Sequence, residues 1–90
     1  MMTKLFNLGA IVATQGAMEH INPSWAKDVL NRHTTGDYGD ICAEDATLND
    51  KAIHNGSRLI SSYYAPDGEK IWVITEADRS VTTFLLPSEY

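Results

Sequence analysis

Residues 58 to 87 read RLISSYYAPDGEKIWVITEADRSVTTFLLP, and this stretch decides the fold. It contains three runs rich in β-branched and aromatic residues: RLISSYYA, EKIWVITEA and SVTTFLLP. Pro66-Asp67-Gly68 separates the first two runs, with proline and glycine in the order that a β-turn favours. The short segment ADRS joins the second run to the third. Three strands with tight connections predict an antiparallel meander.

Upstream of the meander the pattern becomes helical. Asn22 followed by Pro23 is typical of a helix start, with the side-chain cap first and proline at the first helical position. We expect the helix PSWAKDVLNRH to follow over residues 23 to 33. A second helix is predicted from residue 41 to residue 54, N-capped by Asp40 or Asp37. Asn55-Gly56 would end it.

The N-terminal segment LGAIVAT, residues 8 to 14, is predicted to form a further strand, and Thr14 to cap a short helical turn after it. The fold class is therefore α+β in the order β-α-α-β-β-β, with two main helices packed on a small antiparallel sheet. Ninety residues are expected to make one domain, 1–90. The pattern does not determine whether the first strand joins the C-terminal sheet.

Composition and charge narrow the classes of function. The formal net charge is −5, which argues against direct binding to nucleic acid, because that needs basic patches. No apolar run reaches the length of a membrane span, and we expect no membrane association. The lone Cys42 suits a reducing, cytoplasmic setting. No glycine-rich phosphate loop or metal-binding spacing is present, so we expect neither a cofactor nor a metal ion.

Three polar residues are predicted to turn toward the core. At a step of about 100° per residue, the apolar residues of the second helix fall within an arc of about 160°. These residues are Ile41, Cys42, Ala46, Leu48, Ala52 and Ile53. Asp45 falls near the middle of that arc, and Asn49 lies one turn later. On the preceding helix, His33 falls among the apolar residues in the same way.

Buried carboxylate and imidazole groups are costly unless they are hydrogen-bonded or paired. Arg58 and Arg79 are the cations with the least obvious surface role and are expected to pair with them. Glu76, Asp78 and Arg79 also gather where a strand ends, either as a charged turn or as a functional loop. The candidate binding residues are His33, Asp37, Asp45, Asn49, Arg58, Glu76, Asp78 and Arg79.

The polar cluster has two interpretations. It is either a structural network or a cleft that binds or acts on a ligand, since perturbed titratable groups gather at such sites. A Cys42–His33 pair, assisted by Asp45, would resemble a thiol hydrolase, but no nucleophile signature surrounds the cysteine.

Residues 32 to 90 resemble a family of small bacterial proteins carried by plasmids, prophages and integrative elements. The resemblance rests on His33-x-x-Gly36-Asp37-Tyr38-Gly39, on KIWVITEADRS and on LLPSEY, with a looser match at GAIVAT. It implies an accessory protein of a mobile element without an established enzyme activity.

We therefore expect a small cytoplasmic protein that binds another protein and modulates or inhibits a host defence complex, of restriction or CRISPR type. The alternative is a small enzyme with a polar cleft around His33, Asp45 and Arg79. A homodimer formed through an exposed sheet face or edge is a third possibility.

Overall fold

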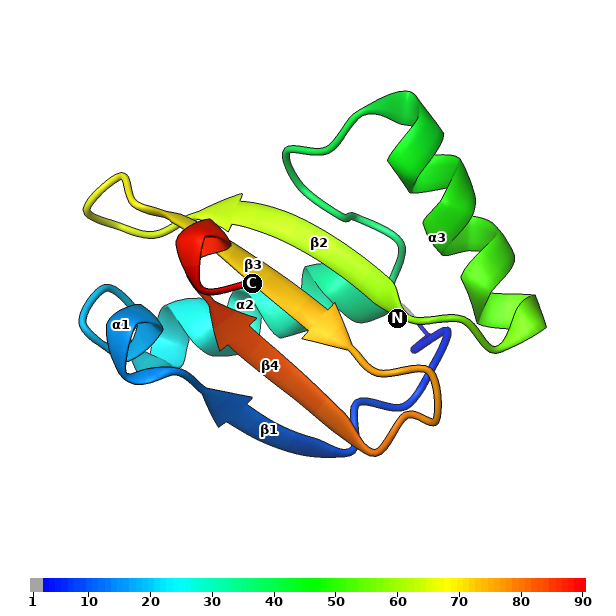
Figure 1. Ribbon diagram of the computed structural model, residues 1–90, viewed down its shortest axis with the longest axis horizontal. Coiled ribbons are helices and arrows are strands. Elements are labelled where there is room, and N and C mark those ends of the chain that lie inside the picture. The colour runs from blue at the N-terminus through cyan, green and yellow to red at the C-terminus, as the bar shows by residue number, and fades with distance from the viewer. Residues whose placement is uncertain (1–2) are drawn as a thin grey trace.

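The computed structural model describes residues 3–90, which form a sheet, three α-helices and a C-terminal 3-10 helix (Figure 1). The elements are β1 (Ala10–Ala13), α1 (Gln15–Met18), α2 (Pro23–Thr34), α3 (Ala43–Asn55), β2 (Leu59–Tyr64), β3 (Lys70–Thr75), β4 (Val81–Leu85) and η1 (Pro87–Glu89). This order confirms the predicted α+β fold, with α1 as the short helical turn that Thr14 caps.

The sheet has the strand order β1-β4-β3-β2. Strands β2, β3 and β4 form the predicted antiparallel meander. The turn after β2 is closed by hydrogen bonds between Ala65 and Glu69 and between Gly68 and Ala65. The first strand joins the same sheet, but it pairs with β4 in parallel, Ala10 opposite Val81. The sheet is therefore mixed, and the connection from β1 to β4 contains the three α-helices and the strands β2 and β3.

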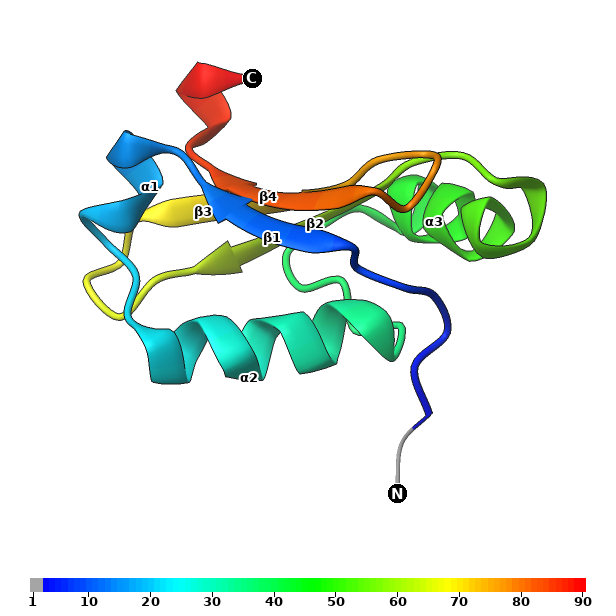
Figure 2. The same cartoon turned by 90° about the horizontal axis from the view of Figure 1, so that it is seen from below.

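Helix α2 covers one face of the sheet (Figure 2). It begins as predicted, because the Asn22 side chain accepts a hydrogen bond from the Trp25 N–H at 2.9 Å and Pro23 occupies its first turn. Strand residues that alternate along β2, β3 and β4 point toward it. The core on this face contains Ala17, Val29, Tyr63, Ala65, Ile71, Val73 and Phe84.

Helix α3 packs against the sheet from the side, along the β2 edge, rather than over a face (Figures 1 and 2). A second core lies there, made of Phe6, Tyr38, Ala52 and Leu59. The helix begins at Ala43, two residues later than predicted, and Cys42 is its N-cap without a side-chain hydrogen bond. It ends as predicted at Gly56, which adopts a left-handed φ of 77°.

The segment before α3 lies against the outer edge of β2. Ser62 receives a hydrogen bond from the N–H of Asp40 at 2.7 Å and donates its own N–H to the Tyr38 carbonyl at 3.0 Å. Gly39, between them, has a φ of 74°, and a Cβ there would lie 2.0 Å from the Ser62 carbonyl oxygen. Glycine is therefore required for this close approach, which places α3 beside β2.

Candidate functional site

His33 is turned inward as predicted and is completely buried. Its Nδ1 lies 2.5 Å from Oγ of Ser61, and its Nε2 lies 2.9 Å from Oγ1 of Thr75. Burial disfavours the charged imidazolium and lowers the pKa of His33 to about 4. The side chain is thus a neutral imidazole between two strand hydroxyls.

The hydrogen bonds continue beyond His33 and fix its tautomer. Thr82 donates its hydroxyl proton to the Leu8 carbonyl at 2.7 Å, so it accepts from Thr75, whose oxygen is 2.7 Å away. The proton of Thr75 is thereby used, and Nε2 of His33 must donate to it. Nδ1 then accepts from Ser61. We call this series, from Ser61 through His33, Thr75 and Thr82 to the Leu8 carbonyl, the buried polar chain; every member is satisfied.

Asp45 does not turn inward; the prediction for it was wrong. The side chain is exposed, as is Leu48, another residue of the predicted apolar arc. The reason is that α3 packs edge-on, so that its buried side is centred on Asn49 and Ala52. The prediction of an inward Asn49 is confirmed, because its amide donates to the Ile60 carbonyl at 2.8 Å and accepts from the Ile60 N–H at 3.1 Å.

The two arginines expected to pair with buried acids do not do so. Arg79 donates to the carbonyls of Ser57 at 2.7 Å and Ala52 at 2.9 Å, and it also bonds two carbonyls of its own turn. It therefore joins the β3–β4 turn to the C-terminal end of α3. Arg58 is exposed and lies over the ring of Tyr90, 5.1 Å from its centroid.

The remaining predicted acids belong to turns. Asp37 forms a two-point ion pair with Arg32, at 2.8 and 3.2 Å, which lowers the pKa of the carboxyl. Asp78 accepts from the backbone N–H of Ser80 at 3.0 Å, and hydrogen bonds from Ser80 lower its pKa. Glu76 is exposed at the start of the same turn. This arrangement matches the charged-turn interpretation rather than a functional loop.

The structure does not bring the predicted cleft together. His33 is sealed on the α2 side of the sheet, Arg79 binds carbonyls at the end of α3, and Asp45 lies on an exposed side of that helix. The Cys42–His33 pair does not form either, because Cys42 is exposed whereas both ring nitrogens of His33 contact hydroxyl oxygens. The expected N-caps of α3 are also engaged elsewhere, Asp37 with Arg32 and Asp40 with Lys70.

A groove of about 640 Å³ lies between α3 and the sheet face that α2 leaves open. Its apolar side chains come from the helix, from β2 and β3 and from the C-terminal end: Ile41, Leu48, Ile60, Trp72 and Tyr90. Leu48 and Tyr90 are 62% and 58% exposed. The rings of Trp72 and Tyr90 meet edge to face, with centroids 5.5 Å apart. Among the predicted candidates, Asp45, Asn49 and Arg58 line this groove.

Charges of both signs surround the groove. Asp40 pairs with Lys70 at 3.1 Å and accepts a hydrogen bond from the Tyr64 hydroxyl at 3.0 Å. Both bonds lower the pKa of Asp40, and the bond to Lys70 has the larger effect. Lys51 and Arg58 are the other cations that line it. The Lys70 end of the groove is thus neutralised internally, whereas its other two cations stay available to a ligand.

Ser62 provides the most informative polar group of the groove. The residue is 3% exposed, and its Oγ has no hydrogen-bond partner among the residues that the structure describes. A buried hydroxyl without a partner is uncommon in folded proteins and destabilising. Ser62 is one of the residues that line the groove.

Sequence reasoning missed Ser62, Ile60 and Leu48 as site residues. A usable signal was present for two of them, because the period of two along β2 places Ile60 and Ser62 on one face. Leu48 was assigned to the core, and only the edge-on packing of α3 exposes it.

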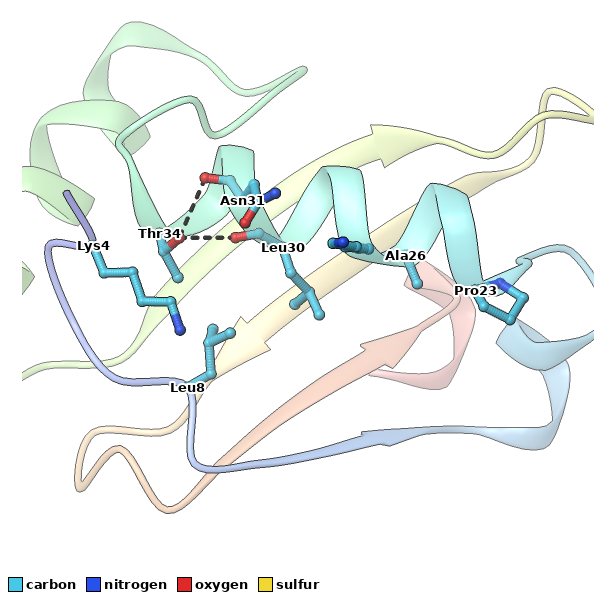
Figure 3. A pocket seen from close by; sticks show the side chains of 8 residues that line it. Lys4, Leu8, Pro23, Ala26, Leu30, Asn31 and Thr34 are labelled. Atoms are coloured by element: carbon cyan, nitrogen blue, oxygen red, sulfur yellow. Dashed lines mark hydrogen bonds between the residues drawn. The ribbon is translucent and has the colours of Figure 1, made fainter. Parts of the chain in front are cut away.

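A second hollow, of about 330 Å³, lies between α2 and the N-terminal segment (Figure 3). Lys4, Leu8 and Leu30 point into it, and the hydroxyl of Thr34 at its end donates to the Leu30 carbonyl at 3.0 Å. The Thr34 hydroxyl is therefore already used in a hydrogen bond. The groove, which has more apolar lining and an unpartnered hydroxyl, is the better candidate site.

Comparisons with known proteins do not place the chain. No protein-family model matches it, and no curated protein or solved structure is significantly similar to it. Within residues 3–90, no helix has the length and apolar character needed to cross a membrane. The same residues hold no cluster of three or more His, Cys, Asp or Glu side chains suited to a metal ion.

Proposed function

We propose that this protein acts by binding another protein, which docks in the groove between α3 and the open sheet face. The observation that carries the proposal is the combination of exposed Leu48 and Tyr90 with the unpartnered hydroxyl of Ser62. Exposed apolar side chains next to aromatic groups are typical of protein–protein contacts. A partner would cover the exposed apolar groups.

The resemblance described above supports a biological setting for this binding. It points to an accessory protein of a plasmid, prophage or integrative element. In that setting we propose that the partner belongs to a host defence complex, of restriction or CRISPR type, which the protein modulates or inhibits. The competing enzyme hypothesis has less support, because His33, Asp45 and Arg79 do not share a cleft.

Affinity purification from cells that carry the gene tests the proposal. Leu48→Lys places a charge in the groove, and Met18→Lys is the matched control, because Met18 is equally exposed at 63% but lies on α1. The wild type and the Met18 variant should recover the same stoichiometric partner, and the Leu48 variant should lose it by about tenfold or more. A protein that recovers no partner, or a Leu48 variant that retains it fully, would contradict the proposal.

A second candidate is self-association through β1, as a homodimer. This strand is the outer strand of the sheet beside β4, and Ile11, at 51% exposed, and Val12 project from it. An apolar outer strand offers backbone groups for pairing with another strand. Light scattering on the purified protein should then report a dimer that Ile11→Lys converts to a monomer. A wild-type monomer at high concentration would remove this candidate.

A further inference from the structure

The groove is more basic than the protein that contains it. Three cations, Lys51, Arg58 and Lys70, and two acids, Asp40 and Asp45, line it, whereas the whole chain has a net charge of −5. Since Asp40 and Lys70 neutralise each other, Lys51 and Arg58 outweigh Asp45. An occupant of the groove should therefore carry negative charge at the Arg58 position.

Arg58 is prepared to bind such a charge. Arg32 is paired with Asp37, and Arg79 is occupied by carbonyl oxygens. Arg58, by contrast, has no hydrogen-bond acceptor or ion-pair partner in the part of the chain that the structure describes, and its guanidinium lies over the Tyr90 ring. A guanidinium that lies over an aromatic ring still has N–H groups that match a carboxylate.

The edge of β2 excludes one way of filling the groove. Both backbone groups of Ile60 are bonded by Asn49, both backbone groups of Ser62 are bonded by segment 38–40, and the Tyr64 carbonyl accepts from the Trp25 indole at 3.1 Å. A partner strand therefore cannot pair with this edge. The occupant must contact the side chains on the open face instead.

The spacing of those side chains sets the pattern of the occupant. Arg58 directly precedes β2, Ile60 is the second residue of that strand, and both line the groove. Two residues of extended chain span about 7 Å. An extended peptide presents alternate side chains at the same interval. When a carboxylate of such a peptide pairs with Arg58, the peptide side chain two residues away would thus lie against Ile60 and Trp72. The exposed walls at Leu48 and Tyr90 suit a chain that leaves the groove at both ends better than an enclosed small molecule.

Building on the proposed function, we infer that the groove binds an extended segment of the partner protein with Asp or Glu two residues from a large apolar side chain. The carboxylate pairs with Arg58, and the apolar side chain covers Ile60 and Trp72. We call this the acidic–apolar segment.

Selection from a random library of 12-residue peptides displayed on phage tests this inference. The baits are the full-length wild type, Arg58→Gln, and Lys27→Gln, which removes an exposed cation of α2. Wild type and the Lys27 variant should enrich peptides with Asp or Glu two residues from Leu or an aromatic residue. The Arg58 variant should not enrich them. Enrichment of basic peptides, the same enrichment on the Arg58 variant, or none above the uncoated support would overturn the inference.

A synthetic peptide from the selection makes the test quantitative. Changing its acid to the matching amide should weaken binding by about tenfold, and Arg58→Gln should weaken the parent peptide equally. The two changes together should cost no more than either alone, because both remove the same ion pair. Additive losses would overturn the assigned pair. If the Leu48 variant loses its partner while the library yields basic peptides, the proposed function stands and this inference fails. If the Leu48 variant retains its partner while the library yields the acidic–apolar segment, the proposed function fails and the preference of the groove stands.

Discussion

Ser61 and Ser62 are adjacent on β2 and both are buried, yet their hydroxyls have opposite surroundings. Ser61 points toward α2 and bonds His33, at the start of the buried polar chain. Ser62 lines the groove, and its hydroxyl bonds no group within residues 3–90. The two faces of one strand therefore separate a fully hydrogen-bonded part of the core from the groove.

The difference shows where the protein leaves polar groups unsatisfied. On the α2 side a histidine, a serine and two threonines are buried without an unmet hydrogen bond, which a low-dielectric core requires. On the groove side, among residues 3–90, the buried hydroxyl of Ser62 is left without a partner. Buried polar groups are normally hydrogen-bonded, so this hydroxyl is an exception beside a fully satisfied network.

The largest expected effect is that of His33→Ala. It removes a buried ring, leaves the hydroxyl of Ser61 without its acceptor and takes one of the two partners of Thr75, so we expect a loss of about 3–5 kcal/mol in the free energy of unfolding. Urea denaturation measures it. His54→Ala, on an exposed helical histidine, is the control and should change stability by less than about 0.5 kcal/mol. Equal effects at the two positions would remove the distinction between the buried polar chain and the surface.

The next largest effect is expected in the pH dependence of stability, which should reflect the protonation of His33. Its pKa is about 4 in the folded protein and 6.5 when exposed, so between these values the unfolded chain binds more protons. Stability is then fully present above pH 6.5 and falls as the pH is lowered toward 4, by about 3 kcal/mol in all.

Other titratable groups with shifted pKa values change stability mainly outside the range between pH 4 and pH 6.5. Asp67 holds the pKa of His20 above its usual value, so the contribution of His20 is constant below pH 6.5 and is lost only at higher pH. The lowered pKa values of Asp37 and Asp67 place their effects at more acidic pH. Urea midpoints from pH 7 to pH 5 should therefore fall, and a flat profile would contradict a buried neutral His33.

Asn49→Ala tests the boundary between the two regions. The change frees both backbone groups of Ile60, and we expect a loss of about 2 kcal/mol. Hydrogen exchange at the Ile60 amide should accelerate more than exchange in β3. Asn31→Ala, at an exposed position of α2, is the control. An unchanged Ile60 amide would show that Asn49 does not protect the β2 edge.

The smallest effect on stability, and the one of opposite sign, is expected for Ser62→Ala. Removing a buried hydroxyl that has no partner should leave stability unchanged or raise it by up to about 1 kcal/mol. The matching change Ser61→Ala should destabilise, because His33 then loses the donor to its Nδ1. Urea denaturation of the pair measures both signs. Equal destabilisation would mean that Ser62 has a structural partner, and the comparison would fail.

Local chemistry predicted the features that depend on neighbours in sequence. The Asn22 cap, the Gly56 stop, the turn after β2 and the meander are all set by a few adjacent residues, and each is present. Helical periodicity also placed His33 and Asn49 in the interior. It failed for Asp45 because periodicity gives a direction around a helix axis but not the direction from which the sheet meets that helix.

The sequence by itself determined the strands, the α-helices, several of their ends and two of the buried polar residues, since capping, turn geometry and side-chain period act over a few residues. It did not determine the start of α3 or the helix η1. Tertiary structure alone decided that β1 pairs in parallel with β4, that α3 lies along the β2 edge and that Ser62 is left without a partner. The physical reason is that hydrogen-bond satisfaction is a property of the whole assembled fold. Asn49 uses both backbone groups of Ile60, α3 is thereby held at the edge, and the open sheet face beside it becomes a groove.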